Sequence, residues 1–122
     1  MILVLMGLML SIACSTVGDN RPRTSLTITV QHHDRVISGI DVHVKFFATE
    51  FPGYDNWEQF DAIQRSDNQG QVRFADFPLG NHWFIGIGYD ELIREQVIGN
   101  IDLRFDLANL SQDVVMYVSE EH

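Results

Sequence analysis

The sequence predicts an all-β domain, an antiparallel β-sandwich of about seven strands. Three observations support this fold: apolar side chains recur at every second position, the apolar runs are short, and turn-forming residues separate them. No long amphipathic helix fits anywhere in the chain. The 122 residues suffice for one domain, and 45% of them are hydrophobic, so a packed core is expected.

The chain begins with an uncharged apolar segment, residues 1–13, which ends at the single cysteine, Cys14. This segment is shorter than the roughly 20 apolar residues that span a bilayer, and its length suits the apolar part of a signal peptide. Small residues, Ser11 and Ala13, stand just before the cysteine. The alternative interpretation is an apolar first strand with a buried thiol.

The end of this segment resembles the bacterial lipobox, in which a small residue precedes a cysteine that is lipidated and becomes the new N-terminus. The resemblance implies that residues 1–13 are a lipoprotein signal peptide and that Cys14 carries the lipid. Ser11 stands where the lipobox usually has leucine, and the start of the chain has no lysine or arginine. Residues 14–23 are polar, with glycine, asparagine and proline, and are expected to form the lipidated tether. The sandwich domain then covers residues 24–122.

Strands are expected in the order of the alternating or apolar runs: residues 26–30, 40–46, 62–66, 71–74, 83–89, 101–107 and 114–118. Turn signals separate them at residues 38–39, 52–53, 67–70, 78–80 and 99–100. The last run, residues 114–118, is apolar on both faces, which predicts a central strand covered on both sides. Residues 89–98 could hold one helical turn.

Three sequence patterns specify the fold more closely. Residues 38–44 read Ser-Gly-Ile-Asp-Val-His-Val, residues 67–74 read Asp-Asn-Gln-Gly-Gln-Val-Arg-Phe, and residues 77–80 read Phe-Pro-Leu-Gly. Together they resemble the prealbumin-like (transthyretin-like) domains of the carboxypeptidase regulatory and Cna B-type groups. Phe77 replaces the leucine of that pattern, and His82 replaces its tyrosine.

The register of the strand that follows residues 77–80 stays open. Either His82, Phe84 and Gly86 face the core, or Trp83, Ile85 and Ile87 do; those two sets lie on opposite faces of one strand.

The charge balance excludes one class of partner. The chain has 17 acidic and 8 basic residues, a formal net charge of -9. Nucleic-acid binding needs clustered lysine and arginine, and so does docking of a domain on anionic lipid. We therefore expect no nucleic-acid partner, and membrane association only through the lipid on Cys14.

Two segments were considered as metal sites. Residues 32–34 read His-His-Asp, but neighbours on a strand point to opposite faces, so His32 and His33 should not easily share one ion. His33 could converge with His43 or His82 across strands, which the sequence does not decide. Residues 67–70 suit a tight turn better than a calcium loop, because no ordered series of oxygen ligands follows. No metal or cofactor is expected.

No catalytic constellation is recognisable. There is no Gly-x-Ser-x-Gly motif. Transthyretin-like hydroxyisourate hydrolases share the general fold, but their Tyr-Arg-Gly-Ser tail is absent from residues 116–122. Intradiol dioxygenases, which hold iron with two tyrosines and two histidines, also share the fold, and their motifs are missing. The sequence predicts a protein that is not an enzyme.

Residues 51–60, called the aromatic loop below, are the best candidate for a recognition surface. The segment looks like an insertion and carries four aromatic side chains, and loops on a rigid sandwich commonly bind partners. The candidate contact residues are Tyr54, Asp55, Trp57 and Glu58. In the alternative interpretation, Phe51, Trp57 and Phe60 fold back as a lid on the core.

A lipobox followed by a prealbumin-like domain resembles many small lipoproteins of Bacteroidetes-type bacteria. This resemblance implies a lipid-anchored, non-catalytic envelope protein that serves as a structural or protein-binding module. Ser15 after the cysteine resembles a signal for outer-membrane sorting. The alternative function is a ligand-binding accessory protein that recognises a glycan or a peptide through the aromatic loop.

Overall fold

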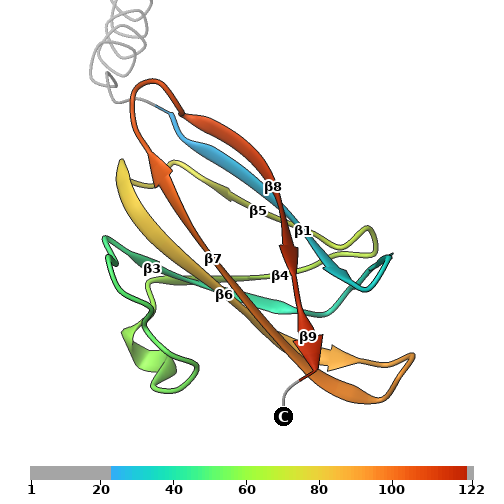
Figure 1. Cartoon of the computed structure of the whole chain (residues 1–122). Coiled ribbons are helices and arrows are strands. Elements are labelled where there is room, and N and C mark those ends of the chain that lie inside the picture. Colours follow the sequence, from blue (N-terminus) through green and yellow to red (C-terminus); the bar gives the residue numbers. More distant parts are fainter. Residues whose placement is uncertain (1–22, 121–122) are drawn as a thin grey trace, which may run out of the picture.

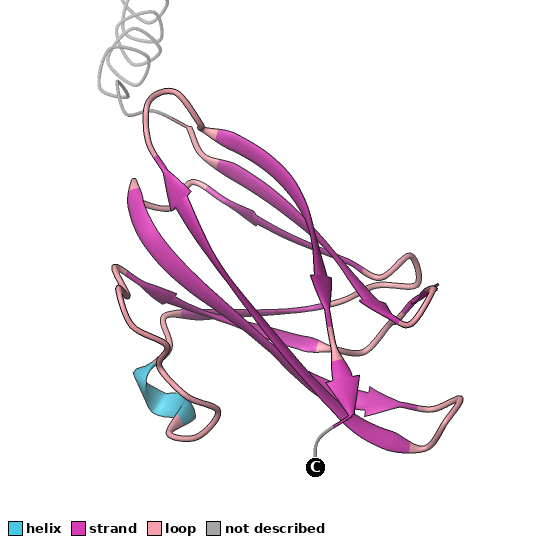
Figure 2. Cartoon of the chain, in the orientation of Figure 1, coloured by secondary structure: helices cyan, strands magenta, loops and turns pink. Residues whose placement is uncertain are grey.

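The computed structural model describes residues 23–120, which form a β-sandwich of two sheets (Figures 1 and 2). Its elements in chain order are β1 (Ser25–His32), β2 (Arg35–Val36), β3 (Asp41–Phe46), the short 3-10 helix η1 (Trp57–Gln59), β4 (Ala62–Arg65), β5 (Gln71–Ala75), β6 (Gly80–Asp90), β7 (Glu95–Phe105), β8 (Ser111–Tyr117) and β9 (Ser119–Glu120). The predicted all-β sandwich is confirmed.

Strand pairing divides the elements between the two sheets. In the first sheet, β1 pairs antiparallel with β2 and β5 and parallel with β8. In the second sheet, the order is β4-β3-β6-β7-β9, and every pair is antiparallel. The β1–β8 pair is thus a parallel exception to the antiparallel arrangement expected from the sequence.

The core fills the space between the sheets, and most of its side chains are those that the period of two placed on one face. Its buried members are Leu26, Ile28, Val30, Ile37, Ile40, Val42, Val44, Val72, Phe74, Phe77, Phe84, Val97, Phe105, Met116 and Val118. Ile37, Phe77 and Val97 join the core from outside the predicted strands, whereas Leu107, at the end of the predicted strand 101–107, is exposed. On β6, His82, Phe84 and Gly86 face this core, which resolves the open register. Ile85 is fully buried too, but it is not part of the core cluster and lies on the outer face of the second sheet.

The turn between β4 and β5 forms as its residue types predict. The Asp67 carboxylate accepts the backbone N–H groups of Gln69 and Gln71 at 2.9 and 3.0 Å. These hydrogen bonds, the one from Gln71 foremost, lower the pKa of Asp67 below its usual value. Gly70 adopts a φ of 75°, and a Cβ there would lie 2.8 Å from Val36 Cβ, so the turn requires glycine.

Residues 89–98 form the β6–β7 hairpin, and its turn, residues 91–94, is closed by a hydrogen bond from the Arg94 N–H to the Asp90 carbonyl at 2.7 Å, the i+4 to i spacing of a single helical turn. Two local expectations are wrong. Gly99 and Asn100 do not form a turn but lie within β7. Residues 114–118 are not a central strand: among the described strands β8 pairs only with β1, and Tyr117 is exposed. Apolar side chains on both faces did not distinguish an edge strand from a central one.

Candidate functional site

The aromatic loop lies on the outer face of the second sheet, between β3 and β4. Trp57 in η1 stacks on His43 of β3, with ring centroids 4.3 Å apart. Phe60 packs against the same imidazole at 5.5 Å. His43 is the cross-strand partner of Ile85, so the loop that covers His43 also explains why Ile85 is buried. Burial lowers the pKa of His43, and its Nδ1 has no hydrogen-bond partner within the described residues.

The other half of the loop packs on β6 and β7. The phenol oxygen of Tyr54 accepts a hydrogen bond from the Asn100 side-chain amide at 2.8 Å. The Tyr54 ring also contacts Phe51 at 5.1 Å, and Phe51 contacts Trp83 at 5.9 Å. Trp83 in turn donates its indole N–H to Asn100 at 3.3 Å. The aromatic side chains therefore do fold back, but onto the outer face of a sheet and not onto the core between the sheets.

The four candidate contact residues differ in exposure. Tyr54 and Trp57 are partly buried by the contacts just described, whereas Asp55 and Glu58 are exposed. Gln59 ties the loop together, because its side-chain amide donates to the Pro52 carbonyl at 3.2 Å. The loop thus presents two carboxylates on an aromatic base that is fixed to the sheet.

A second group of polar side chains lies at the far end of β1. His32 is 2% exposed, and its Nδ1 lies 2.7 Å from Asp90 Oδ2. Arg35 donates to the same carboxylate oxygen at 2.7 Å, and the Leu92 N–H donates to Asp90 Oδ1 at 3.0 Å. On the other side of the ring, His32 Nε2 lies 3.1 Å from Glu120 Oε2. These residues, with His33, are called the histidine–carboxylate cluster below.

His33 joins this cluster, contrary to the expectation that neighbouring strand residues point apart. It follows the last residue of β1 and has a φ of 57°, in the left-handed region, so the strand alternation ends at His32. The two imidazole rings lie 4.1 Å apart between centroids, and His33 Nε2 is 3.4 Å from Glu120 Oε1. The premise that His32 and His33 cannot face one ion is therefore wrong.

The charges in the cluster stabilise one another. The hydrogen bond to Asp90 raises the pKa of His32, and Glu120 acts in the same direction. Burial would raise the pKa of Asp90, but hydrogen bonds with His32 and Arg35 hold it below its usual value. The pKa of Glu120 falls to about 2, through its own backbone N–H and through His32.

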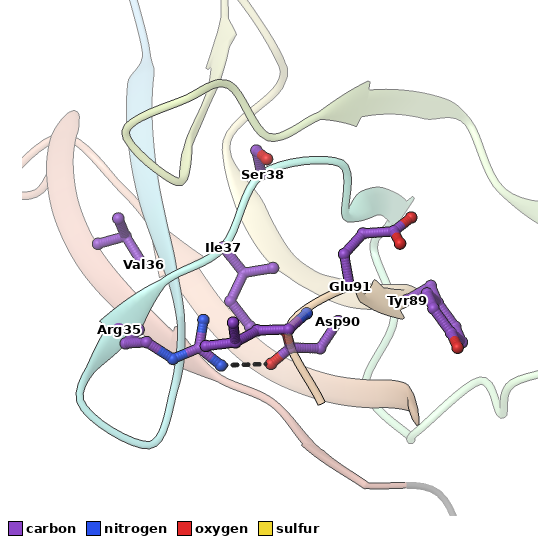
Figure 3. A pocket seen from close by; sticks show the side chains of 8 residues that line it. Arg35, Val36, Ile37, Ser38, Tyr89, Asp90 and Glu91 are labelled. Carbon is purple, nitrogen blue, oxygen red and sulfur yellow. Dashed lines mark hydrogen bonds and ion pairs between the residues drawn. The ribbon is translucent and has the colours of Figure 1, made fainter. Parts of the chain in front are cut away.

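An open hollow of about 360 Å³ lies beside the cluster, as Figure 3 shows. Residues 35–38 line one wall and residues 89–92 the other, with the Arg35–Asp90 ion pair between them. Arg35, Asp90 and Glu120 were not predicted as members of a polar site, because none stands in a recognisable motif and Asp90 and Glu120 lie far from His32 along the chain.

The other buried histidine has a structural role. His82 donates from Nε2 to the Pro78 carbonyl at 2.6 Å and accepts at Nδ1 from the Phe47 N–H at 3.0 Å. Both ring nitrogens are thus engaged, and His43 lies under the aromatic loop. Convergence of His33 with His43 or His82, one of the options left open by the sequence, does not occur.

Cys14 and the tether, residues 14–23, lie outside the described residues except for Arg23, as does the signal-peptide segment, residues 1–13. Among residues 23–120, no helix has the length and apolar character needed to cross a membrane. Thr24, where the sandwich domain is predicted to begin, is buried, and the domain boundaries stay a prediction.

No protein-family model matches the chain, and no curated protein matches it by sequence. Solved structures do match in fold. The crystal structure of BcpA, the major pilin subunit of Bacillus cereus, aligns with 81% of this chain at a TM-score of 0.57 and 11% identity. A variant of that pilin aligns with 80% of the chain at a TM-score of 0.56, again with 11% identity. The chain spans 30% of the pilin's length, so the likeness is to a pilin-like β-sandwich domain and concerns the fold alone.

Proposed function

We propose that this chain is a non-catalytic structural or protein-binding module of the cell envelope, anchored by a lipid on Cys14. The observation that carries the proposal is the fold, which aligns over 81% of the chain with part of a major pilin subunit. Likeness to a pilin subunit favours a structural role, and a sandwich of this kind suits such a role because its sheets bury one continuous core.

The use of buried polar groups supports a structural module. Three almost completely buried side chains each bond to the backbone of a distant segment: Thr24 to Phe77, Ser66 to Ile40 and His82 to Phe47. Ser66, for example, accepts from the Ile40 N–H at 2.9 Å and donates to the Ile37 carbonyl at 2.8 Å. These side chains hold loops to the sheets, and none of the three is directed at a site for a reacting substrate.

The lipid anchor is tested by expressing the chain with its own leader in a bacterium and analysing the membrane fraction by mass spectrometry. We expect residues 1–13 to be removed and a diacyl or triacyl group on Cys14, in a protein that fractionates with the outer membrane. Cys14→Ala should abolish both the modification and the membrane association. An unmodified, soluble full-length chain would contradict the anchor.

A second candidate function is recognition of a glycan or a peptide by the aromatic loop. The observation that favours it is an exposed aromatic surface: Phe51 is 43% exposed and lies beside Tyr54, Trp83 and the Asn100 amide. Aromatic faces beside a polar amide provide apolar contact and hydrogen bonding together.

A glycan array and a peptide array would test this candidate with the Tyr54→Ala/Trp57→Ala double variant. Tyr117→Ala is the matched control, since Tyr117 is an exposed aromatic residue on the other sheet. Binding that disappears only in the double variant supports recognition. A loss of stability with no ligand bound by either protein means that the loop only covers the sheet.

A further inference from the structure

Three potential ligand atoms converge at the end of β1. His32 Nε2 lies 3.1 Å from one oxygen of Glu120, and His33 Nε2 lies 3.4 Å from the other. The ligand atoms that the three residues offer all lie within 4.8 Å of one another. They come from both sheets, because β1 supplies His32 and β9 supplies Glu120.

The buried imidazole leaves one nitrogen without a hydrogen bond. His32 is 2% exposed, and its Nε2 makes no hydrogen bond to any described residue. The Glu120 oxygen 3.1 Å away forms an ion pair with it only when the imidazole is protonated; in the neutral imidazole, Nε2 is a buried polar atom without a donor, which is rare in proteins.

The surroundings of His32 fix the direction of its lone pair. Asp90 accepts hydrogen bonds from Arg35 and from the Leu92 backbone, so it is held as a carboxylate, which only accepts. His32 therefore carries a proton on Nδ1, and in its neutral form the lone pair is on Nε2. Histidine ligands of metal ions are typically oriented by a carboxylate in this way.

We propose that His32 Nε2, His33 Nε2 and a carboxylate oxygen of Glu120 bind a divalent transition-metal ion of the zinc class. Imidazole and carboxylate are ordinary zinc ligands, and bonds of about 2.0–2.1 Å in a tetrahedron place ligand atoms about 3.3 Å apart. Each histidine nitrogen lies at about that spacing from one oxygen of the Glu120 carboxylate, His32 at 3.1 Å from Oε2 and His33 at 3.4 Å from Oε1. The inference does not depend on the proposed lipid anchor.

Three protein ligands leave a fourth position open. His33 is exposed, with 66% of its side chain accessible, so this position faces the side of the cluster that solvent or a partner can reach. A water molecule or a donor side chain of a partner protein would complete the coordination. A metal site of this form would link this end of the sandwich to a second protein without any catalytic group.

The test uses the full chain carrying Cys14→Ser in detergent, so that the thiol does not bind metal. Zinc is titrated calorimetrically, and Co²⁺ is added as a spectroscopic probe, whose visible bands report tetrahedral coordination. We expect one equivalent of either ion to bind. His33→Ala removes an exposed ligand and should lower the affinity for zinc at least tenfold. Its circular dichroism spectrum should be unchanged.

Asp34→Asn is the matched control, because Asp34 is an exposed carboxylate next to His33 that is not one of the three ligands. It should bind zinc as the parent chain does. Asp90→Asn weakens the hydrogen bond that orients the His32 imidazole and should lower the affinity for zinc by about 10–100-fold. Absence of zinc binding by the parent chain, or equal binding by the His33→Ala and Asp34→Asn proteins, would overturn the proposal and leave the cluster as an ion-pair network.

Discussion

Replacing Thr24 with valine should destabilise the sandwich although the side chain keeps its shape. Thr24 is 2% exposed, and its hydroxyl donates to the Phe77 carbonyl at 2.7 Å and accepts from the Phe77 N–H at 2.8 Å. Valine leaves both backbone groups without this partner. A buried polar group that loses its hydrogen bond costs about 1–3 kcal/mol, so for the two groups of Phe77 we expect the free energy of unfolding to fall by about 2–6 kcal/mol.

Thr24→Ser separates the hydroxyl from the methyl group. Serine keeps both hydrogen bonds and removes one methyl group, which costs about 1 kcal/mol. Urea unfolding of the full chain with Cys14→Ser, in a mild detergent, can be followed by the fluorescence of Trp57 and Trp83. If valine cost no more than serine, the hydroxyl of Thr24 would not be what holds Phe77, and the reasoning would be refuted.

Further substitutions test the packing of the second sheet. A Cβ on Gly99 would lie 2.6 Å from the Tyr117 carbonyl oxygen, so Gly99→Ala should cost more than about 2 kcal/mol in urea unfolding. A Cβ on Gly39 meets nothing within 4 Å, so Gly39→Ala should cost only the strain of its φ of 78°, about 1–2 kcal/mol. Because burial lowers the pKa of His43 from 6.5, its contribution to stability is present above that pH and is lost as the pH falls towards the lower folded-state pKa. Urea midpoints between about pH 5 and 8 should show this loss, and His43→Gln should remove it; equal pH dependence in both proteins would contradict the assignment. Trp57→Ala uncovers the imidazole and should raise the pKa of His43 towards 6.5 in an NMR titration, and an unmoved pKa would mean that Trp57 does not desolvate it.

The period-two pattern predicted most of the sandwich because burial of one face fixes the register of a strand. In β1, Leu26, Ile28 and Val30 are all buried, as their alternation with threonine requires. The pattern did not decide the register of β6, because side chains on both faces are buried, Ile85 on the outer face and His82 on the inner one. The aromatic loop covers the outer face of β6, which would otherwise be exposed to solvent. The residues of β6 themselves contain no pattern that predicts this contact.

The histidine–carboxylate cluster was beyond sequence reasoning for a different reason. Alternation of side chains holds only within a strand, and the left-handed backbone of His33 ends it. Asp90 and Glu120 then reach His32 from the end of β6 and from β9, through pairings that the sequence does not specify. A non-glycine residue with positive φ costs energy and persists only where its surroundings fix it. Phe47, Asn56, Asp76 and Arg94 share this conformation, so it is the contacts of His33 with His32 and Glu120 that mark the cluster.

The cluster and the start of the described chain lie at opposite ends of β1 (Figure 1). Seven steps separate Ser25 from His32, and a rise of about 3.3 Å per residue places them roughly 23 Å apart. If Cys14 anchors the protein as proposed, the tether enters at the Ser25 end, and an ion bound by His32 and His33 would lie at the other. The lipid would then attach one end of the sandwich to the membrane, and the open coordination position would lie at the opposite end. That separation favours a protein partner in the envelope, and not the membrane itself, as the donor that completes the site.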